Sequence, residues 1–131
     1  MCAIAMRAVD THVLVRLLAR DDLEQVRRAE AFAGSGAWIS HLVLMEATWV
    51  LQAVYRVAPA QLAAGIALLL EHEHLVVQDA DMVAGALATF RKKPKLGFSD
   101  CLVLEVARRA GHLPLGTFDK DLAKLDGVER L

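Results

Sequence analysis

Short apolar segments alternate with longer amphipathic stretches along the whole chain, and this alternation constrains the fold more than any other feature of the sequence. The short segments predict strands over 7–9, 37–40, 75–78, 113–118 and 128–131. Between them, apolar residues at helical spacing predict helices over 11–19, 41–55 and 82–90, one after Asp21, one ending near His72, and one that Ser99 caps and that Asp100 opens. Because parallel strands are usually connected by helices, we predict an α/β fold, a three-layer sandwich with a central, mostly parallel sheet and helices on both faces.

The length and composition fit one folded domain. A chain of 131 residues with 56% hydrophobic and 24% charged residues can bury a substantial core, so we expect a single domain over 1–131. The two cysteines, Cys2 and Cys101, form neither a disulfide framework nor a paired-cysteine metal site, which favours a reducing compartment. The chain begins without the pattern of a secretory signal and has no apolar run of about 18 residues. A cytoplasmic protein without membrane contact is therefore expected.

Four carboxylates follow or interrupt apolar runs that should form the core. Asp10 follows the first predicted strand, Asp119 follows the fourth, and Asp100 lies in the first turn of a helix. Glu46 lies in the helix over 41–55 among apolar neighbours, where a buried charge would need a compensating cation or donors. Because sites in parallel sheets form beyond the carboxyl ends of the strands, we predict one shared acidic pocket.

Acids forced together in this way favour metal-dependent chemistry. Neighbouring carboxylates raise one another's pKa unless a divalent cation neutralises them, and Mg²⁺ or Mn²⁺ takes such hard oxygen ligands. A metal-bound water loses its proton more readily and can attack a phosphodiester. The chain has no glycine-rich phosphate loop and no serine nucleophile elbow, which leaves this acidic set as the strongest constellation.

In this order, four segments resemble a PIN-domain nuclease, and more closely the toxin member of bacterial VapBC toxin–antitoxin pairs. They are Val9-Asp10-Thr11-His12 with the following VLVRLLARDD, the segment from Ile39 and Ser40 to Glu46, Gly97-Phe98-Ser99-Asp100, and Gly116-Thr117-Phe118-Asp119. The resemblance extends over nearly the full length. It differs at His12, where many relatives carry asparagine or serine.

The resemblance implies a PIN-like sandwich and a Mg²⁺- or Mn²⁺-dependent endoribonuclease. It implies that Asp10, Glu46, Asp100 and Asp119 are the catalytic, metal-binding acids, with Thr117 and Ser40 as supporting hydrogen-bonding residues. It also implies a homodimer that is inhibited by a cognate VapB-like antitoxin, whose carboxyl-terminal segment lies in an apolar groove. The apolar helix around 62–70 has more apolar residues than one buried face requires, so we expect it to form this groove or a dimer contact.

Other residues have competing interpretations. The net charge of −1 leaves RNA binding to local patches or metal ions, and the basic turn of Arg91, Lys92, Lys93 and Lys95 is either an RNA contact or a solvated loop. His12 is either a substrate contact or a surface group, and the run 71–74 is either a metal site or a solvated helix end. Trp38, Trp49 and Tyr55 could stack on bases, although packing is favoured for Trp49.

Two other functional classes remain as alternatives. A phosphotransfer or receiver domain would use an aspartate at a strand end, but a haloacid-dehalogenase-type phosphatase needs a second aspartate where His12 stands. A receiver needs paired acids at the first strand and a later lysine at a strand end, and this arrangement is not evident. A non-catalytic PIN-like binding or regulatory module is the other alternative, and the presence of all four acids argues against it.

Overall fold

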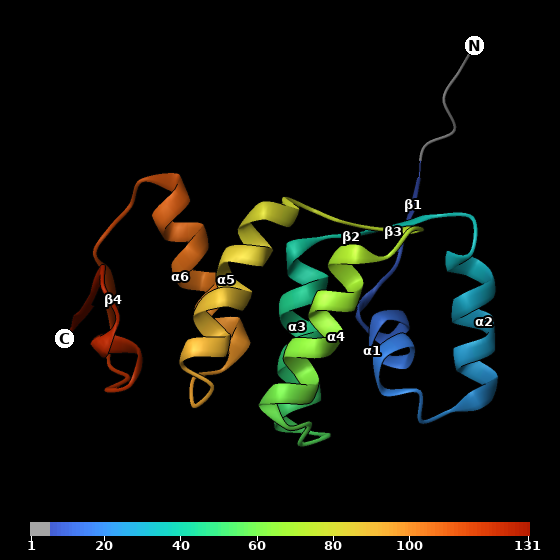
Figure 1. The fold of residues 1–131 in the computed structure, drawn as a ribbon, viewed down its shortest axis with the longest axis horizontal. Helices are drawn as coiled ribbons and strands as arrows, with labels where there is room; N and C mark the ends of the chain where they lie inside the picture. The colour runs from blue at the N-terminus through green and yellow to red at the C-terminus, as the bar shows by residue number, and fades with distance from the viewer. Residues whose placement is uncertain (1–5) are drawn as a thin grey trace, which may run out of the picture.

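The computed structural model describes residues 6–131, which form a mixed α/β fold (Figure 1). The strands are β1 (Arg7–Ala8), β2 (Ala37–Ile39), β3 (Leu75–Val77), β4 (Leu115–Thr117) and β5 (Val128–Arg130). The helices are α1 (Thr11–Ala19), α2 (Leu23–Ala33), α3 (His41–Ala53), α4 (Pro59–Glu71), α5 (Ala80–Lys92) and α6 (Phe98–Ala110), with a short 3-10 helix η1 (Leu122–Lys124). The predicted fold class, with alternating helices and parallel strands, is confirmed.

All the strand pairs are parallel, but the strands form two sheets. One sheet has the order β1-β2-β3, with Ala8 opposite Trp38 and Trp38 opposite Val76. The other contains β4 and β5, with Leu115 opposite Val128. Figure 1 shows the label of β4 at one end of the long axis and β1 toward the other end, with α3 to α6 between them. The predicted central parallel sheet is β1-β2-β3, and β4 and β5 form a second, smaller parallel sheet beyond α6, which packs against α5 and α3.

The core lies between the three-stranded sheet and the helices. Ile39, Leu75 and Val77 turn one side of that sheet inward and are buried. Figure 1 shows α1, α2, α3 and α4 on the same side of this sheet. Farther along the chain, the rings of Phe90 and Phe98 pack edge to face with their centroids 5.8 Å apart, which joins α5 to α6. These contacts fix the positions of the helices that carry Glu46 and Asp100.

Several predicted boundaries differ from the structure. Arg91 and Lys92 belong to the last turn of α5, not to a turn. The predicted strand over 113–118 shortens to Leu115–Thr117 and is only half-buried, because no helix of the described chain covers the two-stranded sheet as closely as the three-stranded one. Among residues 6–131, no helix has both the length and the apolar character needed to cross a membrane.

Candidate active site

Asp100 and Asp119 are the two predicted site residues that the structure brings near each other. Asp100 is half-buried in the first turn of α6, and Asp119 is exposed just after β4. Burial raises the pKa of the Asp100 carboxyl above its ordinary value, and the negative charge of Asp119 raises it further. The electrostatics therefore identify a pair of mutually repelling carboxylates at the start of α6.

The chain around Asp119 is held by short-range hydrogen bonds. The Thr117 hydroxyl oxygen accepts from the Asp119 backbone N–H at 3.0 Å. The Asp119 carboxylate in turn accepts from the backbone N–H groups of Asp121 at 2.8 Å and Leu122 at 3.1 Å. Thr117 thus fixes the backbone on which the Asp119 side chain stands.

A residue of α3 holds the start of α6 beside Asp100. The Gln52 side-chain oxygen accepts a hydrogen bond of 3.0 Å from the Phe98 backbone N–H. A Cβ added to Gly97 would lie 3.7 Å from the Asp100 Oδ2 and 3.8 Å from the Gln52 Oε1, so both groups flank this glycine. The prediction that Ser99 caps this helix is wrong, because Gly97 occupies the cap position without a side-chain bond. Sequence reasoning missed Gln52, whose only local indication is a polar side chain late in an apolar helix.

Cys101, next to Asp100, is excluded as a nucleophile. Its side chain is buried, and burial first and the Asp100 charge second raise the pKa of the thiol to about 11. The thiol therefore stays protonated at neutral pH, whereas nucleophilic or metal-binding cysteine is a thiolate.

Asp10 lies in different surroundings, between α1 and α2. It follows β1 and caps α1, since its carboxylate accepts from the Val13 backbone N–H at 3.0 Å. Its exposed side chain lines a hollow of about 360 Å³ together with His12, Arg16 and Arg28. Asp10 therefore shares this hollow with cationic side chains.

Glu46 is exposed on the outer side of α3, and the expectation of a buried charge at this position is wrong. Its apolar helical neighbours Leu42 and Trp49 are themselves 76% and 56% exposed. Helical spacing indicated correctly that they surround Glu46, but not that this face lacks a covering element. The Ser40 hydroxyl caps the same helix by accepting from the Val43 backbone N–H at 3.2 Å.

The four acids do not form one cluster within this chain. Among residues 6–131, no group of three or more histidine, cysteine, aspartate and glutamate side chains lies close enough to hold a metal ion. The acids and histidines at 71–74 do not form such a group either. The separation of the acids follows the separation of the strands, since Asp10 follows β1 and Asp119 follows β4.

Basic side chains gather near the C-terminal acids. A hollow of about 310 Å³ is lined by Lys92, Lys93 and Lys95 together with Asp121 and Lys124 from the segment after β4. The basic residues from 91 to 95 are all exposed. Arg91 lines an adjoining hollow between α4 and α5 that shares Pro94 with the first. This arrangement offers several cations to a polyanion that approaches Asp119.

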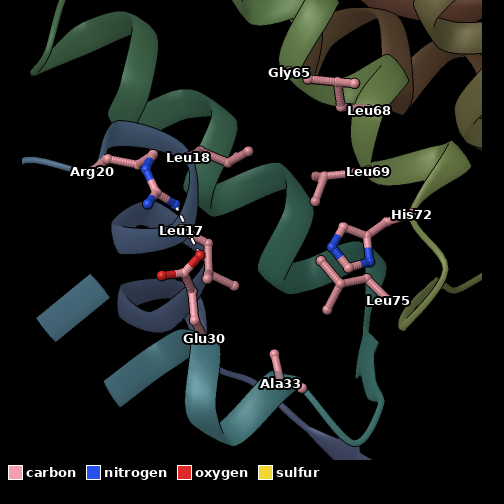
Figure 2. A pocket seen from close by; sticks show the side chains of 11 residues that line it. Leu17, Leu18, Arg20, Glu30, Ala33, Gly65, Leu68, Leu69, His72 and Leu75 are labelled. Carbon is pink, nitrogen blue, oxygen red and sulfur yellow. Dashed lines mark hydrogen bonds and ion pairs between the residues drawn. The ribbon is translucent and has the colours of Figure 1, made fainter. Parts of the chain in front are cut away.

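A separate apolar hollow of about 470 Å³ lies between α1, α2, α4 and β3. Figure 2 shows Leu17, Leu18, Leu69 and Leu75 around it and the ion pair of Arg20 with Glu30 at its side. The two charged groups of this pair are 3.3 Å apart. Leu68 also lines the hollow and is 67% exposed, so α4 does present apolar surface to the solvent.

The comparisons with known proteins identify a family. No curated protein and no solved structure matches the chain at a significant level. The family model described as PIN domain matches residues 7–128, a range that includes all four acids and every helix and strand except the end of β5. The match covers far more than half of the sequence, and the chain therefore belongs to the PIN-domain family.

Proposed function

We propose that this protein is a metal-dependent endoribonuclease and the toxin of a type II toxin–antitoxin pair. PIN domains are generally nucleases that bind RNA and use divalent metals. The observation that carries the proposal is the pair of neighbouring carboxylates, Asp100 and Asp119, beside a hollow lined with lysines. None of the ion pairs formed among residues 6–131 involves either acid. Two such carboxylates have the oxygen chemistry that Mg²⁺ or Mn²⁺ requires.

The proposed catalytic set is Asp10, Glu46, Asp100 and Asp119, which would hold the metal. When bound, Mg²⁺ or Mn²⁺ supplies a water of lowered pKa and stabilises the leaving oxygen of the phosphodiester. Thr117 and Ser40 support the set through the backbone, because each accepts an N–H bond in the segment that carries an acid. Gln52 orients Asp100 by anchoring the first turn of α6.

We further propose that the lysine-lined hollow receives the RNA backbone. Lys92, Lys93 and Lys95 are exposed on one side of it, and Lys124 adds a cation from the segment after Asp119. Arg91, in the adjoining hollow, would extend the same path. Contacts to phosphate position a nucleic acid without reading its sequence, so these residues account for affinity and not for target choice.

Cleavage of a structured RNA pool by purified protein, free of antitoxin, tests the nuclease proposal. We expect cleavage with Mg²⁺ or Mn²⁺, loss of cleavage with chelator, and a loss of at least about 100-fold in Asp100→Asn, because a changed metal ligand costs at least as much as a changed supporting residue. Asp126→Asn changes an exposed aspartate of the same region and should keep full activity. Full activity of Asp100→Asn would refute the proposed site.

We also propose that the apolar hollow of Figure 2 binds the carboxyl-terminal segment of a cognate VapB-like antitoxin. Exposed Leu68 and the leucines behind it offer an apolar surface for an apolar segment. Leu68→Glu should weaken copurification of the antitoxin at least about tenfold, since a buried unpaired charge is costly. Leu23→Glu, at another exposed leucine, is the matched control. Equal binding by the two variants would contradict this docking site.

A non-catalytic PIN-like binding or regulatory module is the second candidate. One observation favours it: the described chain has no cluster of three metal-binding side chains. A module of this kind would bind RNA through the lysines and show no metal-dependent cleavage. The cleavage experiment decides between the two candidates, provided that the protein binds RNA under the same conditions.

A further inference from the structure

We propose that the hollow between α1 and α2 is a phosphate-binding subsite, in which Arg16 and Arg28 hold a phosphate group of the RNA backbone beside Asp10. We call it the arginine hollow; the side chains that line it include Asp10, His12, Arg16, Gln25, Arg28 and Phe32. The inference rests on the proposed function, because Asp10 is one of the four acids assigned to the metal. Figure 1 shows α1 and α2 at the opposite end of the long axis from β4, so this contact is separate from the lysine-lined hollow.

The first argument is that other side chains hold Arg16 in place. Its Nε donates to the Gln25 side chain, and its Nη1 donates to the Tyr55 hydroxyl at 2.9 Å. Nη1 also forms an ion pair of 3.5 Å with Asp21, and only 24% of the Arg16 side chain is exposed. Among residues 6–131, no hydrogen bond uses Nη2. Because a guanidinium is planar and its donors are fixed relative to one another, Arg16 keeps a donor in a preset orientation for a ligand.

The second argument is that α2 keeps a surplus of positive charge at Arg28. The Arg28 Nε donates to the Glu24 carboxylate at 3.2 Å, and the same carboxylate is bonded to Arg27. One glutamate therefore pairs with two arginines. Within the described part of the chain, neither terminal nitrogen of Arg28 makes a hydrogen bond, and its side chain is 78% exposed. Arg28 can thus turn its two terminal nitrogens toward an anion without leaving α2.

The third argument is that Asp10 does not neutralise these arginines, although it lines the same hollow. Its carboxylate accepts from the Val13 backbone N–H at 3.0 Å. None of the ion pairs formed by residues 6–131 involves Asp10. The partners of Arg16 and Arg28 hold the cations apart from this acid. The hollow therefore stays open between a carboxylate assigned to the metal and two guanidinium groups.

The charges around the hollow select an anionic ligand. Its lining has two arginines against one carboxylate. A further cation lies at its edge, because the Arg7 guanidinium lies 3.8 Å from the centroid of the Phe32 ring, which lines the hollow. Arginine forks match the oxygens of a phosphate group and bind them in pairs. A backbone phosphate of RNA therefore suits the hollow in both charge and geometry.

This position gives the subsite a definite role in the proposed cleavage. A phosphate held beside Asp10 fixes how far the RNA strand is advanced through the site, and contacts to phosphate carry no information about the base. Arg16 and Arg28 would therefore set the position of the strand and its affinity, not its sequence preference. Tyr55 and Gln25 act through Arg16 and are positioning residues.

Two neighbouring arginines provide a matched test. Arg27 and Arg28 are 77% and 78% exposed and share Glu24 as their partner, but only Arg28 lines the arginine hollow. The probe is a labelled single-stranded oligouridine of about 12 nucleotides. Its binding to Arg27→Ala and Arg28→Ala proteins, each in an Asp100→Asn background with Mg²⁺, is measured by fluorescence anisotropy. Because the background is expected not to cleave, the readout does not depend on activity.

Arg28→Ala should raise the Kd for the oligouridine about tenfold, as expected for the loss of a charged hydrogen bond. The slope of log Kd against log salt concentration should fall by about 0.7, the value for one lost phosphate contact to a single strand. Arg27→Ala should change neither quantity, although it loses a similar ion pair with Glu24. Arg28→Lys keeps the charge and should restore the salt slope, which a merely structural role of Arg28 would not predict.

The outcomes separate this subsite from the nuclease proposal. Equal Kd values for Arg27→Ala and Arg28→Ala would overturn the subsite, and cleavage by the wild-type protein would then still support the nuclease. Weaker binding by Arg28→Ala alone, in a protein whose wild type does not cleave RNA, would support the subsite and count against the nuclease. Loss of antitoxin copurification in Arg28→Ala with unchanged RNA binding would also overturn the subsite, because the hollow would then contact a protein partner.

Discussion

Two pairs of acids, Asp100 with Asp119 and Asp10 with Glu46, differ in how strongly the surrounding structure holds them. Asp100 is half-buried, lies near Asp119, and follows a helix start whose Phe98 N–H donates to the Gln52 side chain of α3. Asp10 and Glu46 are both exposed and belong to elements around the three-stranded sheet. Tertiary packing thus shapes the C-terminal pair at Asp100, whereas Asp119 and Asp10 are held by hydrogen bonds close in the sequence.

The contacts around these pairs explain the difference. In the C-terminal half, the buried Glu105 carboxylate accepts from Arg108 at 3.0 Å and from Arg109 at 2.8 Å. In the N-terminal half, the corresponding polar network is at the surface, where the Tyr55 hydroxyl accepts from Arg16 and donates to Asp21, each at 2.9 Å. Buried charged hydrogen bonds contribute more than exposed ones, so the helix that carries Asp100 should be the more firmly held.

The largest expected effect on stability is that of Glu105→Ala. The change removes the carboxylate that accepts from both arginines, each of which keeps one longer bond to a backbone carbonyl, and it opens a gap beside Gly85, where an added Cβ would lie 2.9 Å from the Glu105 carboxylate. We expect a loss of about 2 kcal/mol in the free energy of unfolding, since the arginines are partly exposed and can turn to water. The midpoint of thermal unfolding should fall by about 8 °C.

Glu30→Ala is the matched control in the N-terminal half. It removes a glutamate whose ion pair with Arg20 is about half exposed on both sides, and exposed pairs contribute little. Calorimetry or denaturant unfolding of the two variants compares the halves directly. If the Glu30 variant lost as much stability as the Glu105 variant, the C-terminal half would not be the more firmly held.

Gln52→Leu should have an intermediate effect on stability. It concerns both halves of the molecule, because Gln52 belongs to α3 and contacts the start of α6. It removes the acceptor for the Phe98 N–H at the start of α6, and we expect a loss of about 1 kcal/mol. Because Asp100 lies two residues farther on, cleavage should fall more than stability alone explains. Gln61→Leu, at an exposed glutamine of α4, is the control for the substitution itself. Unchanged cleavage by a stable Gln52→Leu protein would mean that Gln52 does not orient Asp100.

Local patterns predicted the elements of the fold, but not the distances between them. Gly111 ends α6 with a left-handed backbone, φ of 83°, as is common for a glycine after a helix, and Asp10 and Asp119 follow strands as predicted. These features depend on residues close in the sequence. Whether β4 lies beside β1 depends instead on the packing of α6, and the partner of the Phe98 N–H is 46 residues away. Helical spacing likewise identified the neighbours of Glu46 without showing that they are exposed.

The smallest expected effect on stability is that of Asp10→Asn and Asp10→Ala. Together the two variants separate the capping role of Asp10 from its proposed role as a metal ligand. Its carboxylate caps α1, and asparagine is about as good a cap as aspartate, whereas alanine loses about 1 kcal/mol at such positions. Asp10→Asn should therefore unfold near the wild-type midpoint and Asp10→Ala slightly below it, while both lose cleavage because neither supplies a carboxylate to the metal. Denaturant unfolding and the RNA assay on the same samples measure the two effects. If Asp10→Asn kept its cleavage while Asp10→Ala lost both, the cap alone would explain Asp10, and the N-terminal pair would have no part in the chemistry of Asp100 and Asp119.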